Sequence, residues 1–496
     1  MNEGYRLWQL VALLIIGQPD VRPLTPADAI GHAAADLIRL PFDAGQHTRY
    51  LSLYNVPAAE RSKVSAVLNG HCNGLSREPD LTPLVIVPNT AGSLLRIDLR
   101  NYRWDRSTWE KLSDPYFTVT VEVETFKVTP WEGGLWEGKF YAAGAFEYKK
   151  PVKVRTQQAL APWLTETPEA RDKLEKVVTW TQSKIPVVRG DWFFNQTAAA
   201  AGRIPNYYDF LAVKDEATFR RAIGADVKLA EEFGSELREA VAISGVTLNP
   251  RAIARHATLG GGYWRTFDFE DKNGGKSPLR VLGKDVEGEY AASEQFGHLP
   301  NGLWATGLFD RAGKVQATAP DSVASDGHSR SNDRRIHVNV SCLRCHSDGG
   351  LQPIDGWVRN LLTPPLAVQT PDAAKARELR RQYLRRLEPF LSRDRLTFED
   401  AIKEATGLDS KGYSKAHAAY WESYEDRKIG IDDAAADLGT TRATLAAALD
   451  ATVKANQGDT VLSVLLLNNP RINRVPVRVW EDSFPAAMLM LKGFRQ

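Results

Sequence analysis

The chain has 496 residues, which is long enough for two or three domains or for one large fold with insertions. Hydrophobic residues make up 43% and charged residues 25%, the ordinary proportions of a soluble globular protein. The 63 basic and 61 acidic side chains leave a formal net charge of only +2. This balance lacks the basic excess of nucleic-acid-binding proteins, so we expect no nucleic-acid partner.

The first 29 residues have features of an export signal. Leu7–Gly17 is an apolar run with one polar interruption, Gln9. It is shorter than the roughly 20 apolar residues that span a bilayer, but it suits the core of a secretory signal. Ala27–Ala29 has the small-x-small form of a cleavage site. We therefore expect an export segment at 1–29 and no membrane span in the mature chain; the alternative is a buried first helix.

Residues 30–160 are expected to form an α+β region. A helical start is followed by the segments "LVIVPN", "LLRIDLRNYRW" and "FTVTVEVETFKV", which are rich in β-branched and aromatic residues. The last of them alternates with the period of two that is typical of a strand. These patterns predict an antiparallel sheet near residues 81–150.

Residues 161–310 are expected to be mainly helical, with a loop and strand part. The amphipathic segments "ETPEARDKLEKVVTWTQSKI", "KDEATFRRAIG" and "ADVKLAEEFGSELREAVAISG" predict helices, the last one closed by Gly245. "GGGYWRTFDFEDKNGG" predicts loop and strand, and "LPNGLWATGLFDRAGKVQA" predicts a hairpin with its turn at Asp310–Gly313.

Residues 311–496 contain two of the three cysteines, in the window "VNVSCLRCHSDGG". Cys342-x-x-Cys345-His346 is the attachment signature of a c-type haem. The two thiols form thioether links to the haem vinyl groups, and the histidine binds the iron as its proximal ligand. The expected cofactor is therefore one covalent haem c with its iron. Its assembly requires an oxidising compartment, so we expect a periplasmic or otherwise extracytoplasmic location.

Two other uses of this window stay open. A thioredoxin-like dithiol needs a strand before the motif and a helix opening at the first cysteine. "IHVNV" could be that strand, but the residues 347–350 would end the helix at once. A zinc site could use both cysteines with His337 or His346, but it lacks the second Cys/His pair that structural zinc sites show. The third cysteine, Cys72, has the character of a small buried hydrophobe.

After this window the segments "PDAAKARELRRQYLRRLEPFL", "TFEDAIKEATG", "YSKAHAAYWESYEDRK" and "IDDAAADLGTTRATLAAALDATV" predict successive helices. The expected fold class is therefore α+β: a mixed first half with an antiparallel sheet, and a mainly helical second half that carries a cytochrome c-like haem segment.

The sixth ligand of the iron is harder to assign. The nearest downstream methionine, Met488, lies far along the chain in an apolar segment. His256 is the leading candidate, because it is followed by three glycines, which allow close approach of the backbone to a cofactor, and then by Tyr263 and Trp264. We expect these two aromatic residues to line the haem pocket. His71 is the second histidine candidate.

The segments "TRYLSLYNVPAAER", "CNGLSREPDL", "IPVVRGDWFF", "GVTLNPRAIARHATLGGGYWRTFDF", "LPNGLWATGLFDRAGKV" and "VSCLRCHSDGG" occur in this order. As a set, they resemble large single-haem c-type cytochrome proteins found mainly in planctomycetes, over about residues 45–350. The resemblance implies an exported protein with one covalent haem and the same roles for Cys342, Cys345 and His346. His256 and His71 stand at matching positions. Cys72 and His298 depart from the family pattern, so we expect neither to serve the haem.

Three functions are compatible with a covalent haem. The first is electron transfer to or from a redox protein partner. The second is a mono-haem oxidoreductase, peroxidase-like, with an open sixth iron site; Tyr263, Trp264, Trp304 and Arg255 are residues that could serve it. The third is a haem-bearing subunit or binding module of a larger complex. An electron carrier is favoured over an enzyme, and the partner and oligomeric state are left open by the sequence.

Overall fold

The computed structural model describes residues 24–117, 119–130, 134–136, 139–141, 149–160, 167–232, 235–241, 251–258, 260–268, 290–320, 325–327, 329, 333–347, 383, 386–454 and 474–495. Helices and mainly antiparallel sheets are both present, which confirms the α+β class. In this part of the chain, no helix combines the length and apolarity that a membrane crossing needs. Residues 1–23, and with them most of the expected export segment, lie outside the described residues.

The first helix, α1 (Pro26–Leu37), begins inside the segment that was expected to be an export signal. Thr25 and Asp28 form a reciprocal capping box, in which each side chain accepts a hydrogen bond from the backbone of the other. Ala29 is buried, and α1 packs against α5 (Pro168–Thr181). A Cβ added at Gly439 would lie 2.4 Å from Thr25 Cγ2, so the cap also contacts the C-terminal helices. Residues 25–29 therefore belong to the folded chain.

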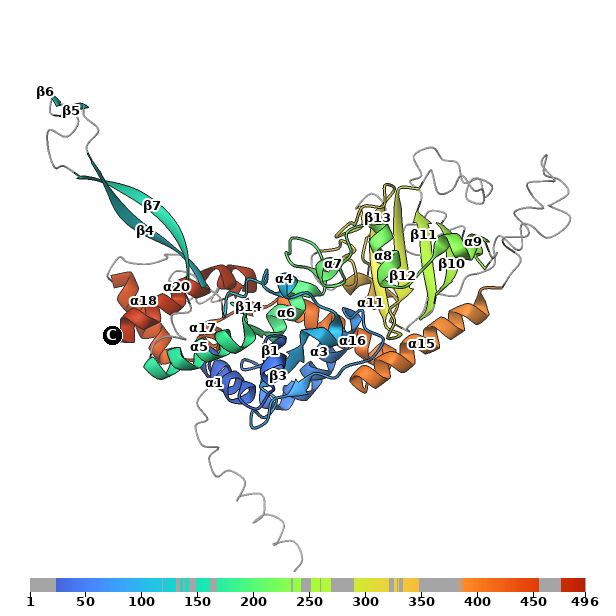
Figure 1. Cartoon of the computed structure of the whole chain (residues 1–496), viewed down its shortest axis with the longest axis horizontal. Helices are drawn as coiled ribbons and strands as arrows, with labels where there is room; N and C mark the ends of the chain where they lie inside the picture. The colour runs from blue at the N-terminus through green and yellow to red at the C-terminus, as the bar shows by residue number, and fades with distance from the viewer. Residues whose placement is uncertain are drawn as a thin grey trace, which may run out of the picture.

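The first sheet has the order β2-β3-β1-β8. Its central strand β1 (Thr48–Ser52) is buried along its whole length, pairs antiparallel with β3 (Leu94–Asp98) and pairs parallel with β8 (Val187–Arg189). The edge strand β2 (Val85–Ile86) is exposed. Helices α3 (Arg61–Gly74) and α6 (Gly190–Thr197) pack beside this sheet (Figure 1). The sheet joins segments from both sides of residue 160, where a boundary between regions was expected.

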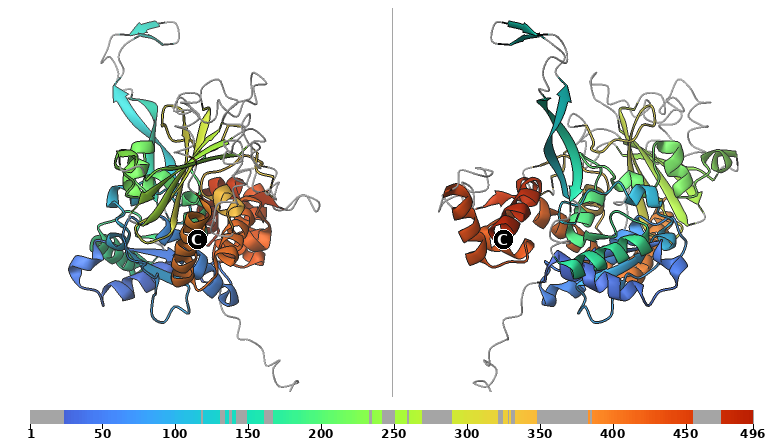
Figure 2. Two further views of the ribbon diagram at one scale, coloured as in Figure 1. Left: turned by 90° about the vertical axis from the view of Figure 1, so that its right-hand side faces the viewer. Right: turned by 60° about the vertical axis from the view of Figure 1, so that its left-hand side comes forward.

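The predicted strands near residues 81–150 form, but in separate sheets. β4 (Val119–Pro130) pairs along its whole length with β7 (Lys149–Leu160), as a two-stranded ribbon. The short strands β5 (Gly134–Trp136) and β6 (Lys139–Tyr141) pair beyond its end. The ribbon extends away from the body of the molecule in every view (Figures 1 and 2).

The second sheet is antiparallel and contains five strands in sequence order: β9 (Leu237–Val241), β10 (Arg251–Thr258), β11 (Gly261–Asp268), β12 (Ala292–His298) and β13 (Trp304–Asp310). The predicted hairpin is present in part, because β13 turns at Gly313 and Phe309 forms a bridge with Val315. The middle region thus carries much more strand than was expected.

One predicted helix is wrong. The segment "ADVKLAEEFGSELREAVAISG" was expected to be helical, but α9 (Val227–Glu232) ends early and β9 follows it. β9 pairs antiparallel with β10 and completes the sheet. Leu, Glu, Arg and Ala favour a helix locally, and pairing with a neighbouring strand overrides that weak preference.

Helices cover both faces of the second sheet (Figure 1). α8 (Glu216–Ala222) packs against β13, and α15 (Glu388–Thr406) packs against β11 on the other face. α16 (Ser410–Glu425) packs against α11 (Val340–Cys345), and α17 (Ile431–Asp437), α18 (Arg442–Lys454) and α20 (Val477–Arg495) follow. The helices predicted from residue 397 onward are therefore confirmed, with α15 starting earlier, at Glu388. The helix predicted over 371–391 lies mostly outside the described residues. The remaining short elements are α2 (Phe42–Gly45), η1 (Ala58–Glu60), η2 (Leu99–Tyr102), α4 (Arg106–Trp109), α7 (Tyr207–Phe210), β14 (Lys428–Ile429) and β15 (Val475–Pro476).

Candidate functional site

The cysteine motif lies on the short helix α11. The helix begins after Asn339, whose positive φ of 66° turns the chain into it, and it ends with His346 as the C-cap. The Asn339 side chain donates a hydrogen bond of 3.0 Å to the Ala198 carbonyl. Ser341 and Arg344 donate to Asp326, at 2.7 and 2.6 Å. These bonds fix α11 between the second sheet and α16.

Cys342 and Cys345 are three positions apart on this helix, so their side chains lie on the same side of it. Both thiols are free, with Cys342 buried and Cys345 half-buried. Burial raises the pKa of Cys345 to about 12, helped by the negative charges of Asp326 and Glu294. Burial likewise raises the pKa of Cys342, with Glu294 contributing.

These raised pKa values mean that both groups are protonated thiols at neutral pH. A reactive dithiol requires a thiolate of lowered pKa, whereas a zinc ion itself deprotonates the thiols that bind it. A dithiol motif also needs a strand directly before it. Among the described residues, this segment forms only one β-bridge, between Thr318 and His337. Among the described residues there is no group of three His, Cys, Asp or Glu side chains placed to hold a metal ion.

His346 packs against aromatic side chains of the second sheet. Its ring centroid lies 4.6 Å from that of Phe296 and 6.4 Å from that of Trp304. Phe296 on β12 pairs with Thr306 on β13, and His298 pairs with Trp304. Because side chains alternate along a strand, all four of these residues point to the same face of the sheet. That face receives α11.

Trp264 lies on this face too, one strand further away. It pairs with Phe296 on one side and with Arg255 on the other. The Arg255 guanidinium donates two hydrogen bonds of 2.8 Å to Asp394 on α15, and the Trp264 indole donates a third of 2.8 Å. The structure thus brings Trp264 to the face of the sheet that His346 contacts. The indole nitrogen of Trp264 and the guanidinium of Arg255, however, both bind Asp394 on α15.

His256 and Tyr263 point to the opposite face. They pair with each other, and Tyr263 pairs with Gly297, one position out of phase with Phe296. The His256 ring stacks on Tyr263 at 5.6 Å between centroids. Neither imidazole nitrogen has a hydrogen-bond partner among the described residues, and Nε2 lies 3.8 Å from Glu236 Oε1. Burial and the neighbouring arginines lower the pKa of His256 to about 3. The structure does not bring His256 or Tyr263 to His346.

His298 is the buried histidine on the motif's face of the sheet. Its Nδ1 lies 3.1 Å from the backbone of Gly262, and its Nε2 lies 2.9 Å from both the Asp394 carbonyl and the Trp304 indole nitrogen. Nδ1 thus contacts the neighbouring strand β11, and Nε2 contacts α15. This role agrees with the expectation that His298 is a poor iron ligand.

His71 and His417 lie on another side of α11. They line a small cavity of about 20 Å³ that is also bordered by Leu343 and Trp304. Their ring centroids are 5.7 Å apart, and His71 Nε2 lies 2.7 Å from Thr197 Oγ1. Neither nitrogen of His417 has a partner among the described residues, and burial lowers its pKa to about 3. Met488 is buried in α20, which packs against α18.

Sequence reasoning missed two parts of this site. Phe296 could have been found, because the alternation in "SEQFGH" places it on the same face as His298. Asp326 could not, because nothing in its local sequence indicates that it accepts hydrogen bonds from Ser341 and Arg344.

The donor set suits a covalent haem. Two free thiols share one side of a helix, and an imidazole follows at its end, against two aromatic rings. In the structure Cys342 is 1% exposed, so its sulfur is covered by protein. No family model, no curated protein and no solved structure matches this chain.

Proposed function

We propose that this protein is an extracytoplasmic c-type cytochrome, with one haem attached through Cys342 and Cys345 and with His346 as the proximal ligand. The observation that carries the proposal is the arrangement of α11: two free thiols on one side and an imidazole at its C-cap. A haem bound there would supply one-electron ferric and ferrous chemistry. The function is electron transfer to or from a redox protein partner.

The surrounding residues would position the ligands. Asp326 and Ala198 accept hydrogen bonds that fix α11, so the orientation of its side chains is set before any cofactor is considered. The Phe296 and Trp304 rings contact the half-buried imidazole of His346. Solvent access and the groups around the ligands are features by which a protein tunes a haem potential.

A second candidate function is a mono-haem oxidoreductase that acts on a small molecule. One observation favours it: a cavity of about 500 Å³ borders α11 at Ser341 and Arg344. A pure electron carrier has no use for such a cavity, whereas an enzyme needs space for its substrate next to the redox group.

The test of the proposed function is the intact mass of the full chain, produced in the periplasm of a host that matures c-type haem. We expect the mass of the polypeptide plus one haem, together with a Soret band. Cys342→Ala with Cys345→Ala should abolish covalent haem, whereas the matched control Cys72→Ala should keep it. His346→Ala should change the spectrum if it leaves haem attached. A wild-type chain without haem in that host would refute the proposal.

A further inference from the structure

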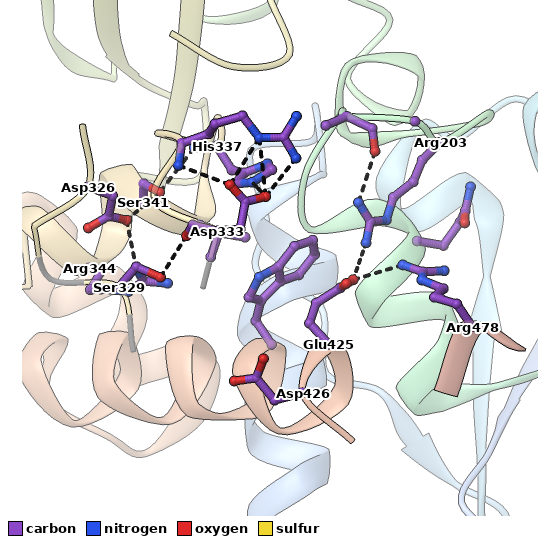
Figure 3. A pocket seen from close by; sticks show the side chains of 16 residues that line it. Arg203, Asp326, Ser329, Asp333, His337, Ser341, Arg344, Glu425, Asp426 and Arg478 are labelled. Carbon is purple, nitrogen blue, oxygen red and sulfur yellow. Dashed lines mark hydrogen bonds and ion pairs between the residues drawn. The ribbon is translucent and has the colours of Figure 1, made fainter. Parts of the chain in front are cut away.

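The segment that carries the cysteine motif is held from two directions. Toward the 500 Å³ cavity, Arg344 on α11 donates a hydrogen bond to Asp326 (Figure 3). Toward the second sheet, the ring of His346 lies against Trp304, with 6.4 Å between the ring centroids. Trp304 also contacts Phe398 of α15, at 5.0 Å between centroids. The position of this indole ring therefore helps to decide where the imidazole of His346 lies.

A single hydrogen bond fixes the polar end of this indole. Trp304 is 4% exposed, and its Nε1 donates a hydrogen bond of 2.9 Å to Nε2 of His298. Among the described residues, the indole has no other acceptor. An indole N–H can only donate, and it is costly to leave a buried N–H without an acceptor. The bond forms only if Nε2 of His298 carries a lone pair and no hydrogen.

A second neighbour of Nε2 favours the opposite state. The Asp394 carbonyl lies 2.9 Å from the same nitrogen and could accept a hydrogen bond from it. Asp394 is in the interior of α15, however, so its carbonyl already accepts from the backbone N–H four residues later. If Nε2 is protonated, the indole N–H loses its acceptor; if Nε2 is not protonated, the carbonyl keeps its helical partner. The competition at Nε2 therefore favours the lone pair.

The hydrogen of a neutral imidazole is then on Nδ1. This atom lies 3.1 Å from both the backbone nitrogen and the carbonyl oxygen of Gly262 on β11. With a hydrogen on Nδ1 the carbonyl accepts, and without it the N–H donates, so Gly262 has one bond in either tautomer. A doubly protonated ring would turn an N–H group toward the N–H groups of both Gly262 and Trp304. Burial also lowers the pKa of His298, so the ring stays neutral.

We propose that His298 is a positioning residue of the haem site. As the Nδ1–H tautomer, it accepts the hydrogen bond from Trp304 and holds the indole ring against His346. His298 does not bind the iron; it acts through Trp304, its directly paired residue on the adjacent strand. The tautomer and the hydrogen bond do not depend on a haem, and only the consequence for the proximal ligand rests on the proposed function.

The tautomer is tested by long-range proton–nitrogen NMR of the full chain, isotopically labelled at histidine, with any attached haem kept ferrous. Loss of the signal in His298→Gln assigns it. We expect a neutral ring with Nδ1 protonated, and Trp304→Phe should shift the tautomer ratio about tenfold toward Nε2–H. The matched control is Trp480→Phe, which removes a buried indole that donates to Asp437 at 2.9 Å and should leave the ratio unchanged. The inference is overturned if Nε2 is protonated in the wild type, or if Trp304→Phe does not change the ratio.

The positioning role has its own readout, which is the ferric-to-ferrous ratio of the matured chain at a fixed potential. His298→Leu removes the acceptor, so we expect the indole to move and more water to reach His346. Because water stabilises the more highly charged ferric state, the ratio should rise by about threefold. His298→Gln keeps an acceptor and should restore most of the wild-type ratio. If His298→Leu does not fold, Trp304→Phe removes the same hydrogen bond and is measured in its place; an unchanged ratio would rule out the positioning role.

The two proposals fail separately. A matured chain without haem refutes the proposed function, but the tautomer of His298 can still be measured in it. A chain that carries haem and has Nε2 of His298 protonated overturns this inference alone.

Discussion

The two faces of the second sheet each bury a histidine, and the two residues have opposite surroundings. His298, on the face that receives α11 and α15, has both nitrogens within hydrogen-bond distance of partners. His256, on the face toward α8, has none among the described residues. The first face joins its histidine to a hydrogen-bond network, whereas the other places His256 against the Tyr263 ring, although Arg265 on that face pairs with Glu216 at 3.0 Å. Burial of a histidine therefore does not identify a haem ligand; its face relative to the motif is what counts.

The largest effect on stability should come from replacing Asp394 on α15. Its carboxylate accepts hydrogen bonds from the face of the second sheet that receives α11. Asp394→Ala leaves the buried Arg255 guanidinium without its carboxylate, so we expect the free energy of unfolding to fall by about 3–5 kcal/mol. Urea unfolding followed by circular dichroism measures it. Asp400→Ala, at an exposed position of the same helix, is the control and should change stability by less than about 0.5 kcal/mol. Equal effects of the two variants would contradict the difference between the faces.

The next effect is a pH dependence from the α8 face. His256 has a folded-state pKa of about 3, below the 6.5 expected in the unfolded chain, so the folded protein keeps it neutral. Its contribution to stability is complete above pH 6.5 and is lost as the pH falls toward 3. Between pH 7 and pH 4, protonation of His256 should cost wild type on the order of 3 kcal/mol of its free energy of unfolding. His256→Phe should not show this loss, because it has no imidazole to protonate.

Urea unfolding across this pH range is the measurement. Tyr263→Phe is the matched control, because it keeps the ring beneath His256 and removes no group that titrates below neutral pH. If His256→Phe shows the same loss of stability with falling pH as wild type, the imidazole is not held neutral by burial.

A smaller effect tests the tight packing under α8. A Cβ at Gly297 would lie 2.2 Å from Ile223 Cδ1, so Gly297→Ala should destabilise the fold by about 2 kcal/mol. Ile223→Val removes that Cδ1 atom. The double variant should therefore be more stable than the sum of the two single effects predicts, as measured by thermal unfolding. Simple additivity would show that this face can relax around the added methyl group.

The smallest effect concerns a single hydrogen bond. Trp264→Phe removes the indole that donates to Asp394 at 2.8 Å and should cost about 1 kcal/mol. In the Asp394→Ala background the same substitution should cost less, because the acceptor is already gone. A full cost in that background would mean that Trp264 acts through packing alone.

Local patterns predicted many elements of this fold, because their signals lie within a few residues. Thr167 and the apolar spacing after it placed α5, and the period of two in "FTVTVEVETFKV" placed β4. β9 was missed, since only pairing with β10 makes that segment a strand. The parallel pairing of β1 with β8 is also non-local, so one sheet contains strands from both sides of the expected boundary at residue 160.

For the site, the motif singled out Cys342, Cys345 and His346, and the structure shows the two cysteines on α11 with His346 as its C-cap. His256 does lie beside Tyr263 in space, but both are on the face of the sheet opposite to His346. A strand alternates its side chains, so a shift of one residue moves a histidine from one face of the sheet to the other. The face on which Tyr263 lies follows from its pairing with Gly297, and no local sequence pattern reveals this pairing.

The capping box of α1 has a consequence for maturation. Thr25 supplies the cap of the first helix and also contacts Gly439, so it connects the beginning of the described chain to its last helical layer. A peptidase that cut after Ala29 would unravel this start and bare apolar surface on two distant segments. If the chain is trimmed, a cut that spares the fold must lie upstream of Thr25, and N-terminal sequencing of chain produced in the periplasm of an expression host would locate it.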